Sequence, residues 1–312
     1  DTTSSTILAV HEAYWGLVAA RQQLEVATVS LGRAKRLREV NHAKLEQGII
    51  AEVEVLQAET DVATRQEQVA AADKGIADAQ DMLLRLITNP GDYERWEGQV
   101  VPTTEPAVGQ PIPVPNWREA AQVAFEHRPD LQRLASELGE REHDLSVSRN
   151  AGRMKLDLTG SLGSGSALPG TAGPEETFRF DFPEFSVSIN LEVPLGNRAA
   201  NAREKAAVSL VARARRALDE GRAQSLQEVK AAVRDLGYLA ERRVATDLAV
   251  RLAERQLAGE ERKYEVGLST NFEVLALQED LATAESNRVA AVTDYAQALA
   301  QLRHVQGTLD RA

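Results

Sequence analysis

The sequence predicts a mainly α-helical protein with a small β part, in which long antiparallel helical hairpins are joined to a single β-hairpin. Three observations predict this fold class. Aromatic residues make up only 4% of the 312 residues, while Ala, Leu, Val, Glu, Gln and Arg dominate, as is typical of long helices in bundles and coiled coils. One segment of the chain occurs twice. Apolar residues alternate strictly in one region, whereas elsewhere they recur at helical spacing.

The duplicated segment covers residues 45–65 and 264–284. When the copies are aligned on Gly48 and Gly267, the tripeptide Glu-Val-Leu follows six residues later in both. Each copy lies between two long Ala-rich stretches. Solenoid repeats have periods of about 20–50 residues, so a repeat this distant predicts a duplicated half-molecule, with one helical hairpin in each half.

The first-repeat helical hairpin is expected over residues 1–88. Apolar residues near the N-terminus recur at steps of three and four, which predicts a helix over 6–46. Such a helix is roughly 60 Å long. Gly48 can end this helix and let the chain reverse, and a second helix follows over 51–87.

A proline-rich connecting segment is expected over residues 89–116, because prolines at this density break helices and favour extended chain. The region 117–153 follows as the helical start of the second repeat. Within it, the run Arg128-Pro129-Asp130 predicts a break in the helix.

The region 154–196 has the pattern of a β-hairpin. Apolar and polar residues alternate from Lys155 and again from Phe185 to Val193, so each strand has one apolar and one polar face. Strands of about nine residues can cross a bilayer when tilted, which predicts a hairpin with a lipid-facing and a lumen-facing side. The expected lipid-facing residues are Leu156, Leu158, Val187, Ile189 and Leu191, and the expected lumen-facing residues are Lys155, Asp157, Ser188, Asn190 and Glu192.

Aromatic residues gather at one end of this hairpin, where a membrane barrel would have an aromatic girdle. They are Phe178, Phe180, Phe182 and Phe185. An amphipathic hairpin that packs on a soluble core has the same alternation of residues, and the strand pattern alone favours this second interpretation.

The second-repeat long helical hairpin and C-terminal helix are expected over residues 197–312. A helix over 199–265 would be about 100 Å long. It leads to the second tip at Gly267 and then to a last helix that ends near Gln306.

Charge and composition exclude several function classes. The net charge of −11 and the pI of about 5.1 disfavour nucleic acid, whose phosphates attract basic surfaces. The chain has no cysteine, which excludes disulfides and thiolate sites. No apolar run is long enough for a transmembrane helix, and no two histidines have the i, i+4 spacing of a helical zinc site. We therefore expect no enzyme activity, no catalytic residue, no cofactor and no metal.

Taken together, these features resemble the TolC family of trimeric outer-membrane efflux and secretion ducts. The matching features are the two Gly-x5-Glu-Val-Leu tips, the run from Arg128 to Leu131, the strand end from Val193 to Arg198 and the proline-rich segment between the halves. The resemblance covers nearly the whole chain. It implies that the helical hairpins form an α-barrel and that the transmembrane β-hairpin contributes to a trimeric β-barrel, so it reverses the preference for a soluble hairpin.

The resemblance also implies a function and partners. The chain would be the outer-membrane exit duct of a tripartite efflux pump or a type I secretion system in a Gram-negative bacterium, passing small molecules or polypeptides to the exterior. The implied partners are a periplasmic adaptor, an inner-membrane pump, outer-membrane lipid and two further copies in a homotrimer. The adaptor would dock on exposed hairpin tips at Gly48, Ile49, Ile50, Val266, Gly267, Leu268, Ser269 and Thr270.

A gate near the tips is a further implication of the resemblance. Glu273 aligns with an acidic position that narrows the duct in relatives, and Glu54 is its partner in the first repeat. Three copies would form a ring of carboxylates that raise each other's pKa and attract cations. Ala276 and Ser269 replace an expected second acidic ring and a bridging Arg, which predicts a looser closure. The alternative is that Glu273 caps or salt-bridges the start of the last helix.

The first repeat departs from the family pattern. The counterpart of residues 117–222 would lie before Asp1, so we expect that about 100 residues, including one β-hairpin, are missing from this sequence. Three copies of the sequence would supply only six strands, which is fewer than the eight strands of the smallest known barrels.

Two other function classes remain as alternatives. One is an elongated soluble helical-hairpin scaffold without transport activity, which would have no use for a lipid-facing β-hairpin. The other is a soluble enzyme, which the absence of a convergent polar site in the sequence disfavours.

Overall fold

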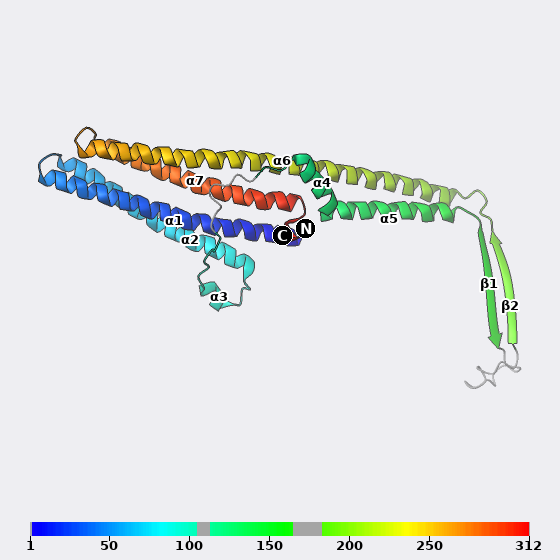
Figure 1. Ribbon diagram of the computed structural model, residues 1–312. Coiled ribbons are helices and arrows are strands. Elements are labelled where there is room, and N and C mark those ends of the chain that lie inside the picture. The colour runs from blue at the N-terminus through cyan, green and yellow to red at the C-terminus, as the bar shows by residue number, and fades with distance from the viewer. Residues whose placement is uncertain (1, 105–112, 165–182, 312) are drawn as a thin grey trace. The chain divides into compact units, whose positions relative to one another are not determined.

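The computed structural model describes residues 2–104, 113–164 and 183–311, and it consists of long helices and one pair of strands (Figure 1). The prediction of a mainly α protein with a small β part is confirmed. In chain order the elements are α1 (Thr2–Glu46), α2 (Glu52–Ile87), α3 (Tyr93–Glu97), α4 (Trp117–His127), α5 (Pro129–Ala151), β1 (Lys155–Ser164), β2 (Pro183–Glu192), α6 (Arg198–Glu265), α7 (Asn271–Val305) and a 3-10 helix (Leu309–Arg311).

The predicted long helices agree with the observed ones to within a few residues. As the sequence predicts, the chain breaks between α4 and α5, because a proline at the start of α5 has no amide hydrogen to continue the α4 ladder. The short helix α3 is absent from the prediction. Asp92 caps this helix by accepting a hydrogen bond from the Arg95 amide. Of the predicted aromatic cluster, Phe178, Phe180 and Phe182 lie outside the described residues.

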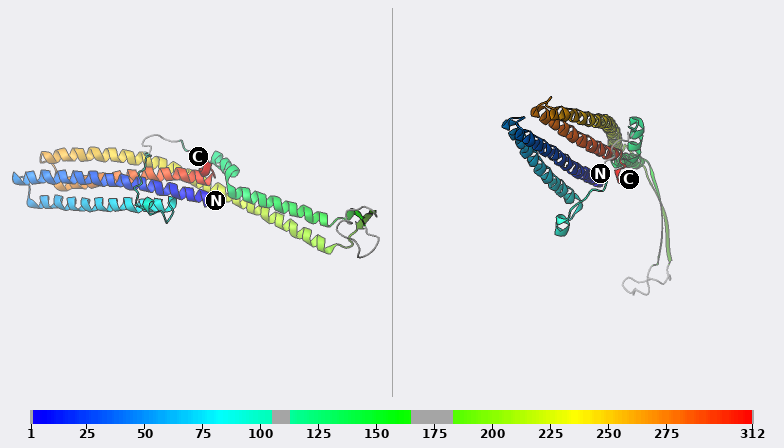
Figure 2. Two further views of the ribbon diagram at one scale, coloured as in Figure 1. Left: turned by 90° about the horizontal axis from the view of Figure 1, so that it is seen from below. Right: turned by 60° about the vertical axis from the view of Figure 1, so that its left-hand side comes forward.

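The chain divides into two compact units, of which the first comprises Asp1–Gln132 and Arg222–Ala312. In this unit the four long helices lie side by side in the order α6, α7, α1, α2 (Figure 1 and Figure 2). Apolar side chains from different helices form the contacts. Leu37 of α1 shares one cluster with Leu257 of α6 and Leu281 of α7.

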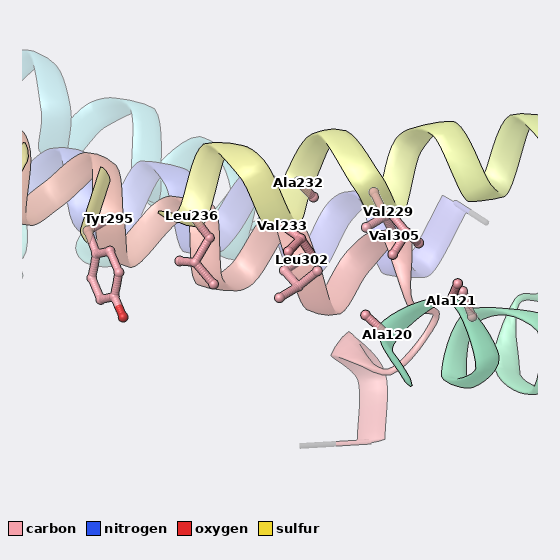
Figure 3. Close-up of a cluster of buried hydrophobic side chains, with 10 residues drawn as sticks. Ala120, Ala121, Val229, Ala232, Val233, Leu236, Tyr295, Leu302 and Val305 are labelled. Atoms are coloured by element: carbon pink, nitrogen blue, oxygen red, sulfur yellow. The ribbon is translucent and has the colours of Figure 1, made fainter. Parts of the chain in front are cut away.

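A further apolar cluster joins α4 to α6 and α7 (Figure 3). Alanines on α4 face larger side chains of the two long helices, so the short helix can approach them closely. Burial of such surface stabilises the fold by about 25 cal/mol for each Å² removed from water. The buried members are Ala120, Ala121, Ala124, Val229, Ala232, Val233, Leu236, Tyr295, Leu302 and Val305.

Arg128 connects the junction of α4 and α5 to the two long helices. Its guanidinium pairs with Asp130 at 2.7 Å and also with Glu228 of α6. It donates a hydrogen bond to the Val305 carbonyl at the end of α7, at 3.4 Å. The hydrogen bond from Arg128 holds the pKa of the Asp130 carboxyl below its usual value. One charged side chain therefore joins three helices at this junction.

The second unit comprises Arg133–Gly221 and contains the strands with the adjoining parts of α5 and α6. Arg149 of α5 pairs with Glu204 of α6 at 3.1 Å. The two strands pair antiparallel as a two-stranded sheet. Within the described part of the chain, no helix combines the length and the apolar character needed to cross a membrane.

Candidate functional site

Two glycines turn the chain at the predicted hairpin tips. Gly48 joins α1 to α2 with a φ of 70°, and Gly267 joins α6 to α7 with a φ of 80°, in the left-handed region that glycine adopts without strain. The amides of Ile49 and Leu268 donate to the carbonyls five residues earlier, at 2.9 and 2.8 Å. This is the hydrogen bond of a Schellman motif, so the sequence repeat is also a repeat of backbone geometry.

Apolar side chains are exposed at both tips. Leu268 is 78% exposed, and Ile49 and Val266 are exposed as well. Ile50 was expected to join them, but it is partly buried, so this part of the prediction is wrong. Ile50 precedes the N-cap of α2, a position from which an apolar residue commonly packs on the fourth helical residue, here the buried Val55.

A buried polar network joins the two hairpins beside their tips. Asn41 of α1 is 0% exposed, and its Nδ2 donates to Asn271 Oδ1 of α7 at 2.8 Å. The Tyr264 hydroxyl of α6 donates to Asn41 Oδ1 at 2.6 Å, and Asn271 Nδ2 donates to the Glu54 carbonyl of α2 at 3.3 Å. We call Asn41, Tyr264 and Asn271 the tip clasp, because they connect all four long helices.

The surroundings of Tyr264 keep its hydroxyl protonated. Burial, together with the nearby charge of Glu54, raises the pKa of Tyr264 to about 12. The Lys44 ammonium lies 3.5 Å from the centre of the Tyr264 ring, within the range of a cation–π interaction. The hydroxyl is therefore a hydrogen-bond donor throughout the physiological pH range.

The sequence analysis did not identify the tip clasp. The signal available for it is that Asn41 lies one helical turn after the buried Leu37, so a polar residue occupies the apolar stripe of α1. A buried amide needs partners, since leaving a donor or acceptor unpaired costs about 1–3 kcal/mol. Those partners lie in the other hairpin and are not evident from the local sequence.

The two predicted gate residues have different surroundings. Glu273 is exposed and completes a capping box, in which its amide donates to Thr270 Oγ1 at 3.3 Å and its Oε2 accepts from the Thr270 amide at 3.0 Å. The partly buried Ser269 also donates to this oxygen, at 2.8 Å. Glu54 has no equivalent box, because Ala51 at the N-cap of α2 makes no side-chain hydrogen bond.

These hydrogen bonds hold the pKa of Glu273 below its usual value, with the Thr270 amide as the largest contributor. Within one copy of the chain, Glu273 therefore acts as a helix cap. A ring of three carboxylates would act in the opposite direction and raise the pKa, and it stays a prediction about the assembled protein.

The strand pair separates polar from apolar side chains. The register places Lys155 opposite Glu192 and Leu158 opposite Ile189. Because residues opposite each other in an antiparallel pair point to the same face, the predicted lumen-facing set shares one face. The other face is apolar, with side chains 54% to 73% exposed, and consists of Leu156, Leu158, Leu162, Phe185, Val187, Ile189 and Leu191. Which face meets lipid stays a prediction.

Among the described residues, no group of three or more His, Cys, Asp or Glu side chains could hold a metal ion. The expectation that the chain has no catalytic residue, cofactor or metal site stays a prediction.

Related sequences are found among outer-membrane proteins. The family of outer membrane efflux proteins matches residues 120–308. The alkaline protease secretion protein AprF of Pseudomonas aeruginosa is 23% identical over 309 residues, covering 98% of this chain and 62% of AprF. The pyoverdine export outer membrane protein OpmQ of Pseudomonas putida is 26% identical over 289 residues, covering 89% and 57%. The chain spans about six tenths of the length of these curated relatives.

Solved structures of outer-membrane channels share this fold. The outer-membrane channel OprN superposes with a TM-score of 0.74 at 19% identity, covering 98% of this chain and 66% of OprN. The open state of the Neisseria gonorrhoeae MtrE outer membrane channel superposes with a TM-score of 0.70 at 20% identity, covering 98% and 67%.

Proposed function

Because the chain belongs to the outer membrane efflux protein family, the family of TolC, we propose that it forms the exit duct of a tripartite efflux pump or a type I secretion system. It belongs to the outer membrane and periplasm of a Gram-negative bacterium. In the proposal three copies enclose a path, and no chemical step takes place. An inner-membrane pump and a periplasmic adaptor deliver the cargo.

The proposed cargo is a small molecule or a polypeptide. Both classes have support among the relatives, since AprF is named for the secretion of a protease and OpmQ for the export of pyoverdine. The long helices of the first unit would form the α-barrel of this duct. Their side-by-side arrangement (Figure 2) supports the proposal, because a wall around a path is built from adjacent helices.

The observation that carries the proposal is the exposed apolar face of β1 and β2. Its side chains alternate with polar ones in register across both strands. A face of this kind is stable when lipid covers it and the polar face borders water. Each strand also has an outer edge of backbone groups, and unpaired groups cost several kcal/mol each in lipid. Strands from other copies would pair with these edges and close a trimeric β-barrel.

A soluble helical-hairpin scaffold is not favoured as the function. It would expose the apolar strand face to water and would give this face no role. An exposed apolar face with unpaired strand edges promotes aggregation, which a soluble scaffold has to avoid.

Single-cysteine labelling tests the proposal, and the chain is suited to it because it contains no cysteine. The six positions from Ser186 to Leu191 are changed to Cys one at a time in the full-length gene product. Outer membranes are then treated with a water-soluble maleimide. We expect labelling at Ser186, Ser188 and Asn190 and protection at Val187, Ile189 and Leu191.

Labelling after denaturation serves as the control, because it must reach all six positions. Equal labelling of all six positions in intact membranes would show that lipid does not cover the apolar face, and it would contradict the proposed membrane hairpin.

A further inference from the structure

Two helices form the outer edges of the first unit. Figure 1 and Figure 2 both place α6 at one edge and α2 at the other, with α7 and α1 between them. Each edge helix buries one face, α2 through Val55, Ala58 and Val62, and α6 through Val229, Leu236 and other apolar residues. The opposite face of each edge helix carries side chains that nothing within this unit covers.

The uncovered face of α2 has a regular pattern. Leu56 lies there and is 59% exposed. The exposed Ala63, Ala70 and Ala77 follow on the same face at intervals of seven residues. Seven-residue spacing keeps side chains on one side of a helix that packs along a partner, and alanine lets that partner approach closely.

The uncovered face of α6 repeats this spacing with larger side chains. Tyr238 is 64% exposed, and the exposed Ala245 and Leu252 follow at intervals of seven residues. The exposed Leu248 lies between them on the same face. The bulky residues of α6 and the small residues of α2 therefore have matching spacing and complementary size.

The exposed charges of the two edges have opposite net sign. On α2, six exposed acidic residues outnumber the exposed bases Lys74 and Arg85. Between residues 230 and 255 of α6, four exposed bases outnumber three exposed acids. The acids on α2 are Glu52, Glu59, Glu67, Asp73, Asp78 and Asp81, and the bases on α6 are Lys230, Arg234, Arg251 and Arg255.

We propose that the α2 edge of one copy packs against the α6 edge of the next copy, and that this seam closes the ring of three. The inference rests on the proposed homotrimer and adds which surfaces meet. Two different edges that meet head to tail form a closed ring when the rotation between copies closes. Since α2 runs away from its tip and α6 runs toward its tip, rotation about an axis along the helices places the two edges antiparallel.

Disulfide trapping in the full-length gene product tests this seam. Ala70→Cys is combined in turn with Ala245→Cys, Leu248→Cys and Leu252→Cys, which together sample one seven-residue repeat of α6. We expect oxidation of outer membranes to link copies into dimers and trimers on a non-reducing gel for at least one pair. The single variants should remain unlinked.

A matched control uses the same helix. Ala70→Cys combined with Glu254→Cys places the second thiol at an exposed position on the opposite side of α6 from Leu252. No link between copies is expected for this pair. The two cysteines of one copy cannot react with each other across the seam, because α1 and α7 lie between α2 and α6.

The outcomes separate the seam from the proposed function. A trimer by native mass in detergent, with no link for any of the three pairs, would overturn the seam and leave the exit duct intact. A link from Ala70→Cys to a different protein would also overturn the seam, because another partner would then cover α2. A protein that stays monomeric in detergent would instead contradict the proposed homotrimer.

Discussion

At the scale of single residues, Glu273 has two competing roles with opposite electrostatic signatures. Hydrogen bonds from Thr270 and Ser269 stabilise its charged form and lower its pKa. A ring of three such residues would destabilise the charged form. Because the cap needs only a hydrogen-bond acceptor, whereas the ring needs a charge, substitutions can separate the two.

We predict that Glu273→Gln combined with Glu54→Gln reduces the preference of the open duct for cations and leaves its thermal stability nearly unchanged. Glutamine can replace glutamate in a capping box, so the cap survives without the charge. Glu273→Ala should lose the cap as well, at a cost of about 0.5–2 kcal/mol. Ion selectivity in planar bilayers and thermal unfolding measure the two effects. Unchanged selectivity and conductance in the double Gln variant would show that these residues are caps and not a gate.

The tip clasp gives a second prediction at this scale. Tyr264→Phe removes one hydroxyl and leaves Asn41 Oδ1 without the hydrogen bond that it accepts at 2.6 Å. A net loss of about 0.5–1.5 kcal/mol should increase hydrogen exchange of amides beside Asn271 by roughly two- to tenfold. Tyr238→Phe is the control on the same helix, because Tyr238 is exposed. Equal exchange in the two variants would contradict the connecting role of the clasp.

At the scale of elements, the sequence predicts what local pattern determines. The long helices and both strands were predictable because their apolar residues recur at a fixed period, and the tips were predictable because the glycines recur with their flanking residues. The helix α3 escaped prediction because its five residues are too few to show a period. Ile50 was misplaced because an exposed turn was assumed to expose all its side chains.

The clasp lies beyond local pattern for a different reason. Asn41 and Asn271 are far apart in the sequence and belong to different halves of the duplication. Their positions are not equivalent under the repeat, so the repeat offers no guide to their pairing. Only the packing of one hairpin against the other brings them together.

The Arg128 junction supports a prediction about pH. The pKa of Asp130 is lowered in the folded chain by the hydrogen bond from Arg128. This pairing therefore stabilises the fold above the unfolded pKa of about 4, and its contribution is lost as the pH falls through the lower folded pKa. Asp130→Asn should lower the melting temperature by several degrees at pH 7 and by progressively less below pH 4.

Thermal unfolding of both proteins across this pH range is the measurement. Asp144→Asn provides the control, because Asp144 pairs with Arg141 at an exposed surface position, where ion pairs contribute about 0–1 kcal/mol. A difference between wild type and Asp130→Asn that persists unchanged into acid would contradict the ionic role of Asp130.

At the scale of the whole molecule, the exposed apolar tips predict an adaptor contact. Leu268 is 78% exposed, and an apolar side chain at this position gains free energy when a partner covers it. Leu268→Asp should abolish export and leave the trimer intact, whereas Leu268→Met should retain export because it keeps an apolar surface. Export in cells and native mass in detergent are the readouts. Normal export by Leu268→Asp would exclude docking through this side chain.

Single-channel recording tests the central claim, that this chain forms an exit duct, most directly. The full-length gene product is purified from outer membranes in detergent and added to planar bilayers. The account predicts insertion of trimers as discrete, equal conductance steps that favour cations. The same trimeric preparation giving no conductance steps at any voltage would contradict it.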